Sequence, residues 1–150
     1  MTRPGRFSDF GPDVSFIEVA RYRVIFGDCD PMRIMYYGNY FRLFEFARNE
    51  LFRHSMHAFS QYVAQGLYLA VIDAHCRYVK PAHFDDELII RSGITEYGRA
   101  RLTIGYEILG ADGGLRATGS TLHAIVNEHG RPQRMPTDFR AAMTGKRPAE

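Results

Sequence analysis

Apolar and polar residues alternate with a period of two over residues 16–26, FIEVARYRVIF, near the start of the chain. Arg21 and Arg23 occupy one face of this segment. The opposite face carries four apolar residues, which are Ala20, Tyr22, Val24 and Phe26. A period of two with one polar face predicts a β-strand that packs one side against a core.

The period changes to that of a helix after Gly38 and Asn39. From Tyr40 to about Met56, an apolar stripe recurs at helical spacing. The stripe contains Tyr40, Phe44, Ala47 and Leu51, and it is widened by Phe41, Leu43, Phe46 and Phe52. A helix that is apolar on nearly every side is usually buried, so we expect a curved sheet to cover it. Little else in the sequence predicts helix, apart from a short one that begins at residues 136–138.

The region from Gly66 to Asn127 is typical of strands joined by short turns. Residues 67–72 are apolar on both faces, which predicts a central, covered strand that continues to Pro81. Further strands are expected over residues 88–97, 101–109 and 115–127, with the turn GADGG between the last two. In the segment 101–109 the alternation directs Leu102, Ile104, Tyr106 and Ile108 inward, and Arg101, Thr103 and Glu107 outward.

This order of elements predicts one α+β domain over residues 15–145. Its antiparallel five-stranded sheet would wrap around one long central helix. Residues 1–14 are rich in proline, glycine and polar side chains and are expected to form a flexible N-terminal arm.

The composition argues against several classes of protein. A net charge of +2 is too small to indicate nucleic-acid binding. No apolar run approaches the roughly 18–20 residues that cross a bilayer, and the N-terminus lacks the apolar stretch of a secretory signal. Neither HExxH nor a Cys/His zinc spacing is present, which argues against a metal site. Cys29 and Cys76 are too few for a disulfide framework, so a cytoplasmic protein is expected, although a single Cys29–Cys76 bridge is compatible with the sequence.

Residues 26–48, FGDCDPMRIMYYGNYFRLFEFAR, combine the features that suggest chemistry. Pro31 keeps Asp30 out of helical geometry, so this carboxylate lies on a loop that leads into the predicted helix. Backbone N–H groups at a helix start are unpaired and can bind developing negative charge. A carboxylate beside such donors suits acyl transfer.

With this order of elements, the FGDCDP…YYGNYFRLFEFAR stretch resembles the hotdog-fold acyl-CoA thioesterases, in particular the 4-hydroxybenzoyl-CoA thioesterase/YbgC-like branch. The resemblance covers roughly residues 19–136 and includes the later segment GLYLAVIDAHCRYVKPAHFDDELIIRSGI. It implies a hotdog fold and an acyl-CoA substrate, without a metal or other cofactor. It also implies a homodimer or homotetramer with active sites between subunits.

The resemblance also implies roles for single residues. Asp30 matches the catalytic aspartate, which acts as base or nucleophile, and Tyr37 matches the residue whose backbone N–H polarises the thioester carbonyl. Asn39, with Tyr40, matches the residues that open the central helix. The family usually has glycine three residues after the aspartate, where this chain has Arg33. The arginine would narrow the acyl pocket or direct a cation toward the carboxylate.

Each candidate also has a plainer interpretation. Asp30 could brace its loop, as we expect Asp28 to do. Glu45 and Arg48 match the family's FExxR pair, and their spacing favours an ordinary ion pair over a second catalytic carboxylate at Glu45. Three further groups of residues are candidates for substrate binding. They are Tyr36 and Tyr37 for the acyl chain, Arg33 and Asn39 beside the carboxylate, and Lys80, Arg131 and Arg134 for the CoA phosphates.

Two other functions remain compatible with the sequence. One is a non-catalytic hotdog protein that binds acyl thioesters, with a site damaged by Arg33. The other is a thioesterase that acts on acyl carrier protein, which would favour a basic patch near the site.

Overall fold

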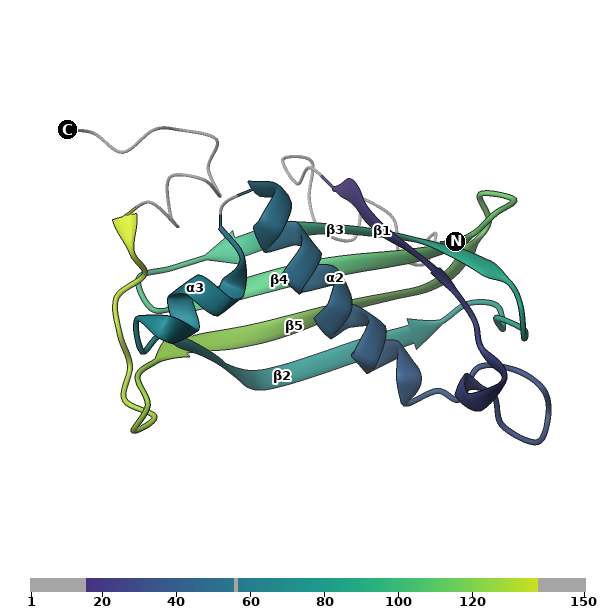
Figure 1. Ribbon diagram of the computed structural model, residues 1–150, viewed down its shortest axis with the longest axis horizontal. Helices are drawn as coiled ribbons and strands as arrows, with labels where there is room; N and C mark the ends of the chain where they lie inside the picture. The colour runs from purple at the N-terminus through teal and green to yellow at the C-terminus, as the bar shows by residue number, and fades with distance from the viewer. Residues whose placement is uncertain (1–15, 56, 138–150) are drawn as a thin grey trace.

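The computed structural model describes residues 16–55 and 57–137, which form one five-stranded antiparallel sheet with a long helix against it (Figure 1). The elements follow in the order β1 (Ile17–Arg23), the 3-10 turn η1 (Phe26–Asp28), α2 (Asn39–Ser55), α3 (Phe59–Ala64), β2 (Tyr68–Tyr78), β3 (Glu87–Tyr97), β4 (Arg101–Gly110) and β5 (Leu115–Val126). The α+β fold class and the hotdog arrangement are confirmed. The expected N-terminal arm and most of the expected C-terminal helix lie outside the described residues.

The core lies between α2 and the inner face of the sheet, as the alternation in β4 predicts. Phe44 and Tyr106 are fully buried and their rings stack at 4.4 Å. Gly119 on β5 allows this close approach, because a Cβ there would overlap the Phe44 ring. The four inward residues of β4 are all fully buried: Leu102, Ile104, Tyr106 and Ile108. Glu107 points to the other face but is buried too, beside Arg91 at 3.3 Å.

The strand order is β1-β3-β4-β5-β2, so β2 lies at an edge of the sheet (Figure 1). The prediction of a central, covered strand over residues 67–72 is therefore wrong. Val71 is 55% exposed and Ile72 is 47% exposed. A strand that is apolar on both faces indicates burial, but no strand among the described residues pairs with the free side of β2. Its unpaired backbone groups can accept another strand.

Two predictions about helices and one about the first strand need correction. Helix α2 is buried along one face only, and Phe41 and Phe46 stay more than a third exposed. The short helix α3 was not expected, because six residues carry too little periodicity; it is held by stacking of Phe59 on Phe52 at 5.4 Å. Phe26 does not face the core, since the strand ends at Arg23 and Phe26 lies in η1 with 76% exposure.

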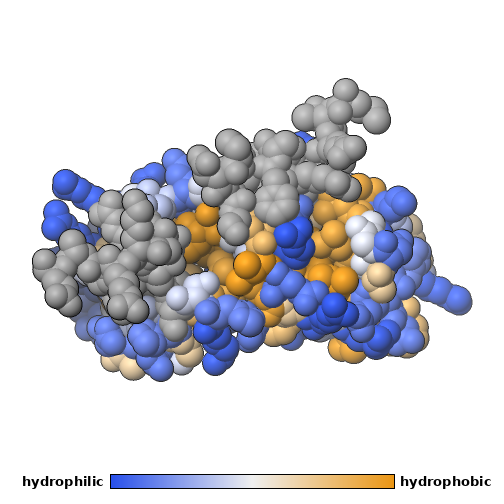
Figure 2. Space-filling model, turned by 90° about the horizontal axis from the view of Figure 1, so that it is seen from above, coloured by the Kyte–Doolittle hydropathy of each residue, from blue (hydrophilic) through white to orange (hydrophobic). Residues whose placement is uncertain are grey.

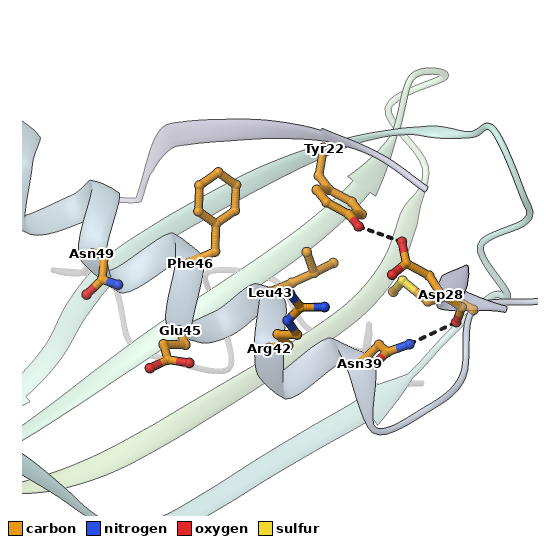
Figure 3. Close-up of a pocket in the computed structure, with 9 residues that line it drawn as sticks. Tyr22, Asp28, Asn39, Arg42, Leu43, Glu45, Phe46 and Asn49 are labelled. Atoms are coloured by element: carbon orange, nitrogen blue, oxygen red, sulfur yellow. Dashed lines mark hydrogen bonds between the residues drawn. The ribbon is translucent and has the colours of Figure 1, made fainter. Parts of the chain in front are cut away.

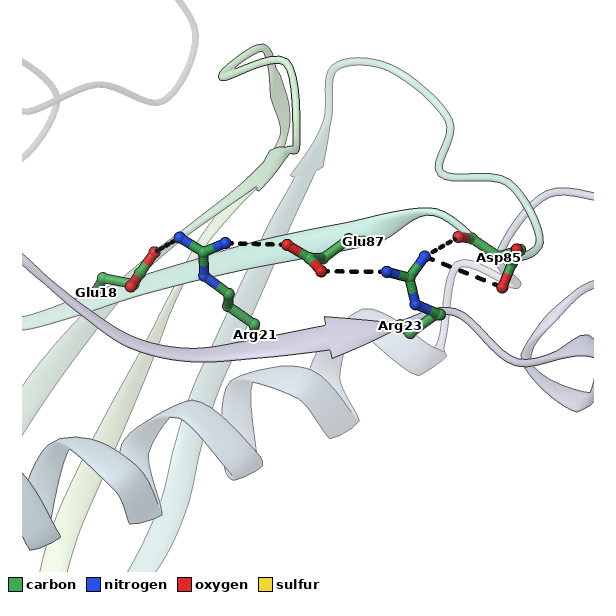
Figure 4. Close-up of polar contacts among 5 residues, drawn as sticks. All are labelled: Glu18, Arg21, Arg23, Asp85 and Glu87. Carbon is green, nitrogen blue, oxygen red and sulfur yellow. Dashed lines mark hydrogen bonds and ion pairs between the residues drawn. The ribbon is translucent and has the colours of Figure 1, made fainter.

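The opposite edge of the sheet, at β1, carries charge. Arg21 and Arg23 bind Glu87 of the neighbouring strand β3 at 3.0 and 3.2 Å (Figure 4). Glu18 and Asp85 extend this row of ion pairs at its two ends. Exposed pairs contribute little stability, but charged side chains make an edge strand a poor partner for a second sheet.

The face seen from above, where β1 lies, exposes apolar side chains in its middle with hydrophilic residues around them (Figure 2). Among the described residues, no helix is long and apolar enough to cross a membrane.

Candidate active site

Asp30 lies in a tight loop between η1 and α2, closed by a β-bridge between Cys29 and Met35. The Asp30 N–H donates to the Ile34 carbonyl at 2.9 Å, and the Asp30 carbonyl accepts the Arg33 N–H at 2.8 Å. Its carboxylate oxygen Oδ1 accepts the Met32 N–H at 2.8 Å, so Asp30 braces its own loop. The second oxygen, Oδ2, has no donor among residues 16–55 and 57–137. One side of this half-buried carboxylate therefore remains available.

Arg33 closes this loop in the left-handed conformation, with φ of 67°. That conformation explains why glycine suits the position, and an L-residue in it costs about 1–2 kcal/mol. The Arg33 side chain is exposed and makes no hydrogen bond or ion pair with any residue that the structure describes. It also lines neither of the two cavities described below. The arginine is thus a cation beside the site, and in this structure it does not narrow the cavity that holds Asp30.

Asp28 holds the loop together, as expected (Figure 3). Its buried carboxylate oxygen Oδ2 accepts the Tyr22 hydroxyl at 2.5 Å and the Ile25 N–H at 3.0 Å. Its carbonyl accepts the Tyr36 N–H at 2.8 Å and the Asn39 side-chain amide at 2.9 Å. Burial, followed by the bond to Asp28, raises the pKa of Tyr22 to about 12. Asp28 thereby joins the end of β1 to the start of α2.

Tyr37 precedes α2, and the backbone carbonyls of Tyr36 and Tyr37, on either side of its N–H, are both occupied. The Tyr36 carbonyl accepts the Asn39 N–H at 3.0 Å. The Tyr37 carbonyl accepts the Tyr78 hydroxyl at 2.9 Å and the Tyr40 N–H at 3.4 Å. The Tyr37 N–H itself has no acceptor within the described part of the chain. It is therefore an unpaired donor of the kind that can bind an oxyanion.

Two neighbouring cavities share Met35 as a wall. The first, the Asp30 cavity, measures about 340 Å³ and brings together Asp30, Tyr37 and Lys80. Its other lining residues are Met32, Ile34, Met35, Tyr40, Tyr78, Val79 and Pro81. The second, the Glu45 cavity, is larger, at about 380 Å³, but does not contain Asp30 (Figure 3). It is lined by Tyr22, Asp28, Met35, Asn39, Arg42, Leu43, Glu45, Phe46 and Asn49.

The structure thus divides the candidate residues between the two cavities. Asn39 and Glu45 line the Glu45 cavity rather than the Asp30 cavity. Tyr36 is exposed beside Tyr37, with ring centres 4.6 Å apart.

The expected ion pair between Glu45 and Arg48 does not form, although the residues are one helical turn apart. Arg48 instead donates to the Tyr106 hydroxyl at 3.4 Å, toward the sheet. Glu45 is exposed and makes no ion pair with another described residue.

Arg131 and Arg134 do not join Lys80. Both follow the end of β5, whereas Lys80 lies near the start of that strand, where its N–H donates to the Arg116 carbonyl at 3.1 Å. Strand β5 has 12 residues, so the two ends are roughly 35–40 Å apart. These three cations cannot bind one phosphate group within a single chain.

The sequence patterns did not single out Tyr22 or Tyr78 as residues of the site. Both point inward on strands, where a tyrosine is usually interpreted as core, and only the structure reveals the polar partner of each hydroxyl. Cys29 and Cys76 are both free thiols, so the bridge between them is absent. Within residues 16–55 and 57–137, no cluster of His, Cys, Asp or Glu is arranged to hold a metal ion.

Comparison with known proteins connects this arrangement to one family. Residues 24–143 match the model of the thioesterase-like superfamily. The acyl-CoA thioester hydrolase YbgC of Escherichia coli is 31% identical over 107 residues, which are 70% of this chain and 78% of that protein. A protein of Aquifex aeolicus with a crystal structure is 30% identical, with a TM-score of 0.78 over 83% of this chain and 97% of the other. The DHNA-CoA thioesterase of Staphylococcus aureus shares the fold, with a TM-score of 0.81, 24% identity, and coverage of 88% of this chain and 89% of that one. The chain therefore belongs to the thioesterase-like superfamily.

Proposed function

We propose that this protein is an acyl-CoA thioesterase that hydrolyses its substrate to a free acid and CoA, with Asp30 and the Tyr37 N–H as its catalytic groups. One observation carries the proposal: a carboxylate with a free oxygen and a residue with an unpaired N–H line the same cavity. The activity in the name of the similar YbgC protein supports the same reaction.

The Tyr37 N–H would donate to the carbonyl oxygen of the thioester and stabilise the negative charge that develops there. One such donor is typically worth about 10²–10³-fold in rate. Asp30 would then act in one of two ways. As a general base it takes a proton from water, whose oxygen attacks the carbonyl carbon, and the C–S bond breaks to release the CoA thiolate. As a nucleophile its oxygen attacks the carbonyl carbon, the C–S bond breaks to release the CoA thiolate, and water then hydrolyses the acyl-aspartyl anhydride to the free acid and the Asp30 carboxylate.

Lys80 also lines the Asp30 cavity, and we propose that it binds an anionic part of the substrate. Arg33 would serve the same purpose from the loop beside the site. Asn39 supports the loop through Asp28, and Tyr36 would contact the acyl group from the exposed side.

We also propose that the protein works as a homodimer or homotetramer in the cytoplasm, without a metal or other cofactor. The free edge of β2, with its exposed apolar side chains, favours pairing with a second chain. Two free thiols fit a reducing compartment. Light scattering at micromolar concentration tests the assembly, and a stable monomer would contradict it.

Thiol release across short, long and aromatic acyl-CoAs tests the activity. Asp30→Asn keeps the shape of the side chain but removes its charge, so turnover should fall at least about 10²-fold. Glu45→Gln tests the second carboxylate, and Glu128→Gln, an exposed carboxylate after β5, is the matched control; neither should lose more than about threefold. Near-normal turnover by Asp30→Asn would disprove its role.

Binding of acyl-CoA with no thiol release by the wild type would favour a non-catalytic binding protein, and activity on acyl carrier protein alone would favour the other alternative.

A further inference from the structure

Tyr78 connects the edge strand β2 to the loop before α2. Its hydroxyl donates to the Tyr37 carbonyl at 2.9 Å, although the two residues are 41 positions apart in the chain. Its ring lies edge-on to Tyr40 with 5.1 Å between ring centres, and edge-on to Tyr37 at 6.4 Å. All three residues line the Asp30 cavity. A phenol is therefore held by its ring in a wall of this cavity while its polar end binds the backbone.

We propose that Tyr78 is a positioning residue for the oxyanion donor, and that its hydroxyl keeps the Tyr37 N–H in the orientation needed for catalysis. The inference rests on the proposed function, because it assumes that the Tyr37 N–H binds the thioester oxygen.

The hydrogen bonds around Tyr37 show why one hydroxyl matters. In a trans peptide the C=O and N–H point in opposite directions, so the Tyr36 carbonyl bonded to Asn39 directs the Tyr37 N–H away from the start of the helix. Rotation about the Tyr37 backbone dihedrals is limited mainly by the hydrogen bonds that the Tyr37 carbonyl accepts. There the Tyr40 N–H is distant, at 3.4 Å, and the Tyr78 hydroxyl at 2.9 Å is the shorter bond.

Gly38 makes this restraint more necessary. It follows Tyr37 directly and has no side chain to limit its backbone, so on that side the chain is restrained by one long hydrogen bond, from the Phe41 N–H to the Gly38 carbonyl at 3.3 Å. Tyr78 is the only described residue outside the segment 28–41 that donates a hydrogen bond to Tyr37 or Gly38. Loss of its hydroxyl should leave Tyr37 held by local contacts alone.

The Tyr78 hydroxyl remains a donor under ordinary conditions. Burial, followed by the neighbouring Cys76, raises its pKa well above the ordinary value for tyrosine. The phenol therefore keeps its proton at any pH at which the reaction would be measured. The ring has a second candidate role, as an apolar wall that binds the acyl group, and the two roles affect different kinetic constants.

Tyr78→Phe separates these roles, because it keeps the ring and removes only the hydroxyl. Tyr68→Phe, at the other end of the same strand, is the matched control. On the best acyl-CoA from the screen, Tyr78→Phe should lower kcat by about 10–10²-fold, the range expected for a misplaced catalytic group. KM should stay within about twofold, since the wall of the cavity is unchanged, and Tyr68→Phe should match the wild type.

Hydrogen exchange provides a readout that does not depend on activity. The backbone amides of residues 36–40 should exchange faster in Tyr78→Phe than in the wild type, while those of β4 should not change. Unchanged exchange in residues 36–40, an unchanged kcat, or a rise in KM alone would each overturn the inference. An equal loss of kcat in Tyr68→Phe would also overturn it, because removal of any tyrosine hydroxyl from strand β2 would then lower kcat. If the wild type releases thiol from no substrate, the proposed function fails, and the exchange result still decides whether Tyr78 holds the loop.

Discussion

His123 should make the stability of this protein depend on pH. Its imidazole is fully buried on β5, where Nε2 lies 2.7 Å from the Thr121 hydroxyl, which in turn lies 2.6 Å from the Tyr106 hydroxyl. The other ring nitrogen, Nδ1, is buried without a partner in the part of the chain that the structure describes. Burial, followed by the charge of Arg48, lowers the pKa of His123 from 6.5 to about 4.

The direction of the effect follows from proton binding. Between the lowered pKa of the folded state and the ordinary pKa, the unfolded chain binds a proton at this histidine and the folded chain does not. The contribution of His123 to the free energy of unfolding is therefore fully present above pH 6.5 and is lost as the pH falls toward 4. The full difference corresponds to about 3 kcal/mol, of which about 2 kcal/mol is lost between pH 7 and pH 5.

Urea unfolding of the wild type and His123→Gln, at one protein concentration, measures this contribution. Glutamine can still bind Thr121 but does not titrate. Subtraction of the two free energies of unfolding therefore cancels the contribution of the carboxylates, which titrate in both proteins. The difference, wild type minus variant, should decrease by about 2 kcal/mol from pH 7 to pH 5. A difference that stays constant to within about 0.5 kcal/mol would refute the argument, because His123 would then titrate alike in both states.

Three substitutions test other parts of the structure. Phe44→Ala removes a fully buried ring that stacks on Tyr106, and chemical denaturation should show a loss of about 3–5 kcal/mol; less than about 1 kcal/mol would mean that the sheet does not cover this face of α2. Tyr22→Phe leaves the buried Asp28 carboxylate with one donor fewer, so the free energy of unfolding should fall by about 1–3 kcal/mol, and an unchanged value would show that water replaces the hydroxyl. Arg33→Gly relieves a left-handed conformation, and thermal unfolding should show a gain of roughly 0.5–1 kcal/mol; a loss would mean that the side chain has a partner in solution.

The inward face of a strand was predictable from sequence, and the features that depend on long-range partners were not. In β4 the alternation placed Ile104 and Tyr106 correctly, because one face packs on α2 and the period of two is undisturbed. The six residues of α3 are too few for a helical period, and their position depends on the contact between Phe59 and Phe52.

The same limit applies at the site. The loop with Asp30 was evident because proline, glycine and a helix start are local signals. The bracing role of Asp28 was also expected, but its partner Tyr22 was not, since a hydroxyl on an inward strand position has no local signature. The spacing of Glu45 and Arg48 indicated an ion pair, yet spacing alone cannot show that Arg48 turns toward Tyr106 instead.

The two edges of the sheet differ in a way that bears on the site. On β1, Arg21 and Arg23 bind Glu87 of the adjacent strand, so that edge presents paired charges. On β2 the exposed side chains include Val71 and Ile72, which makes this edge the better surface for pairing.

The β2 edge also leads to the Asp30 cavity. The strand ends at Tyr78, and Tyr78 and Lys80 both line that cavity. In the proposed assembly, a second chain paired along β2 would lie beside these two residues and shield that wall of the Asp30 cavity from water. Because electrostatic stabilisation by the Tyr37 N–H is stronger where water is excluded, pairing of β2 would then raise the rate of hydrolysis as well as bury the apolar edge.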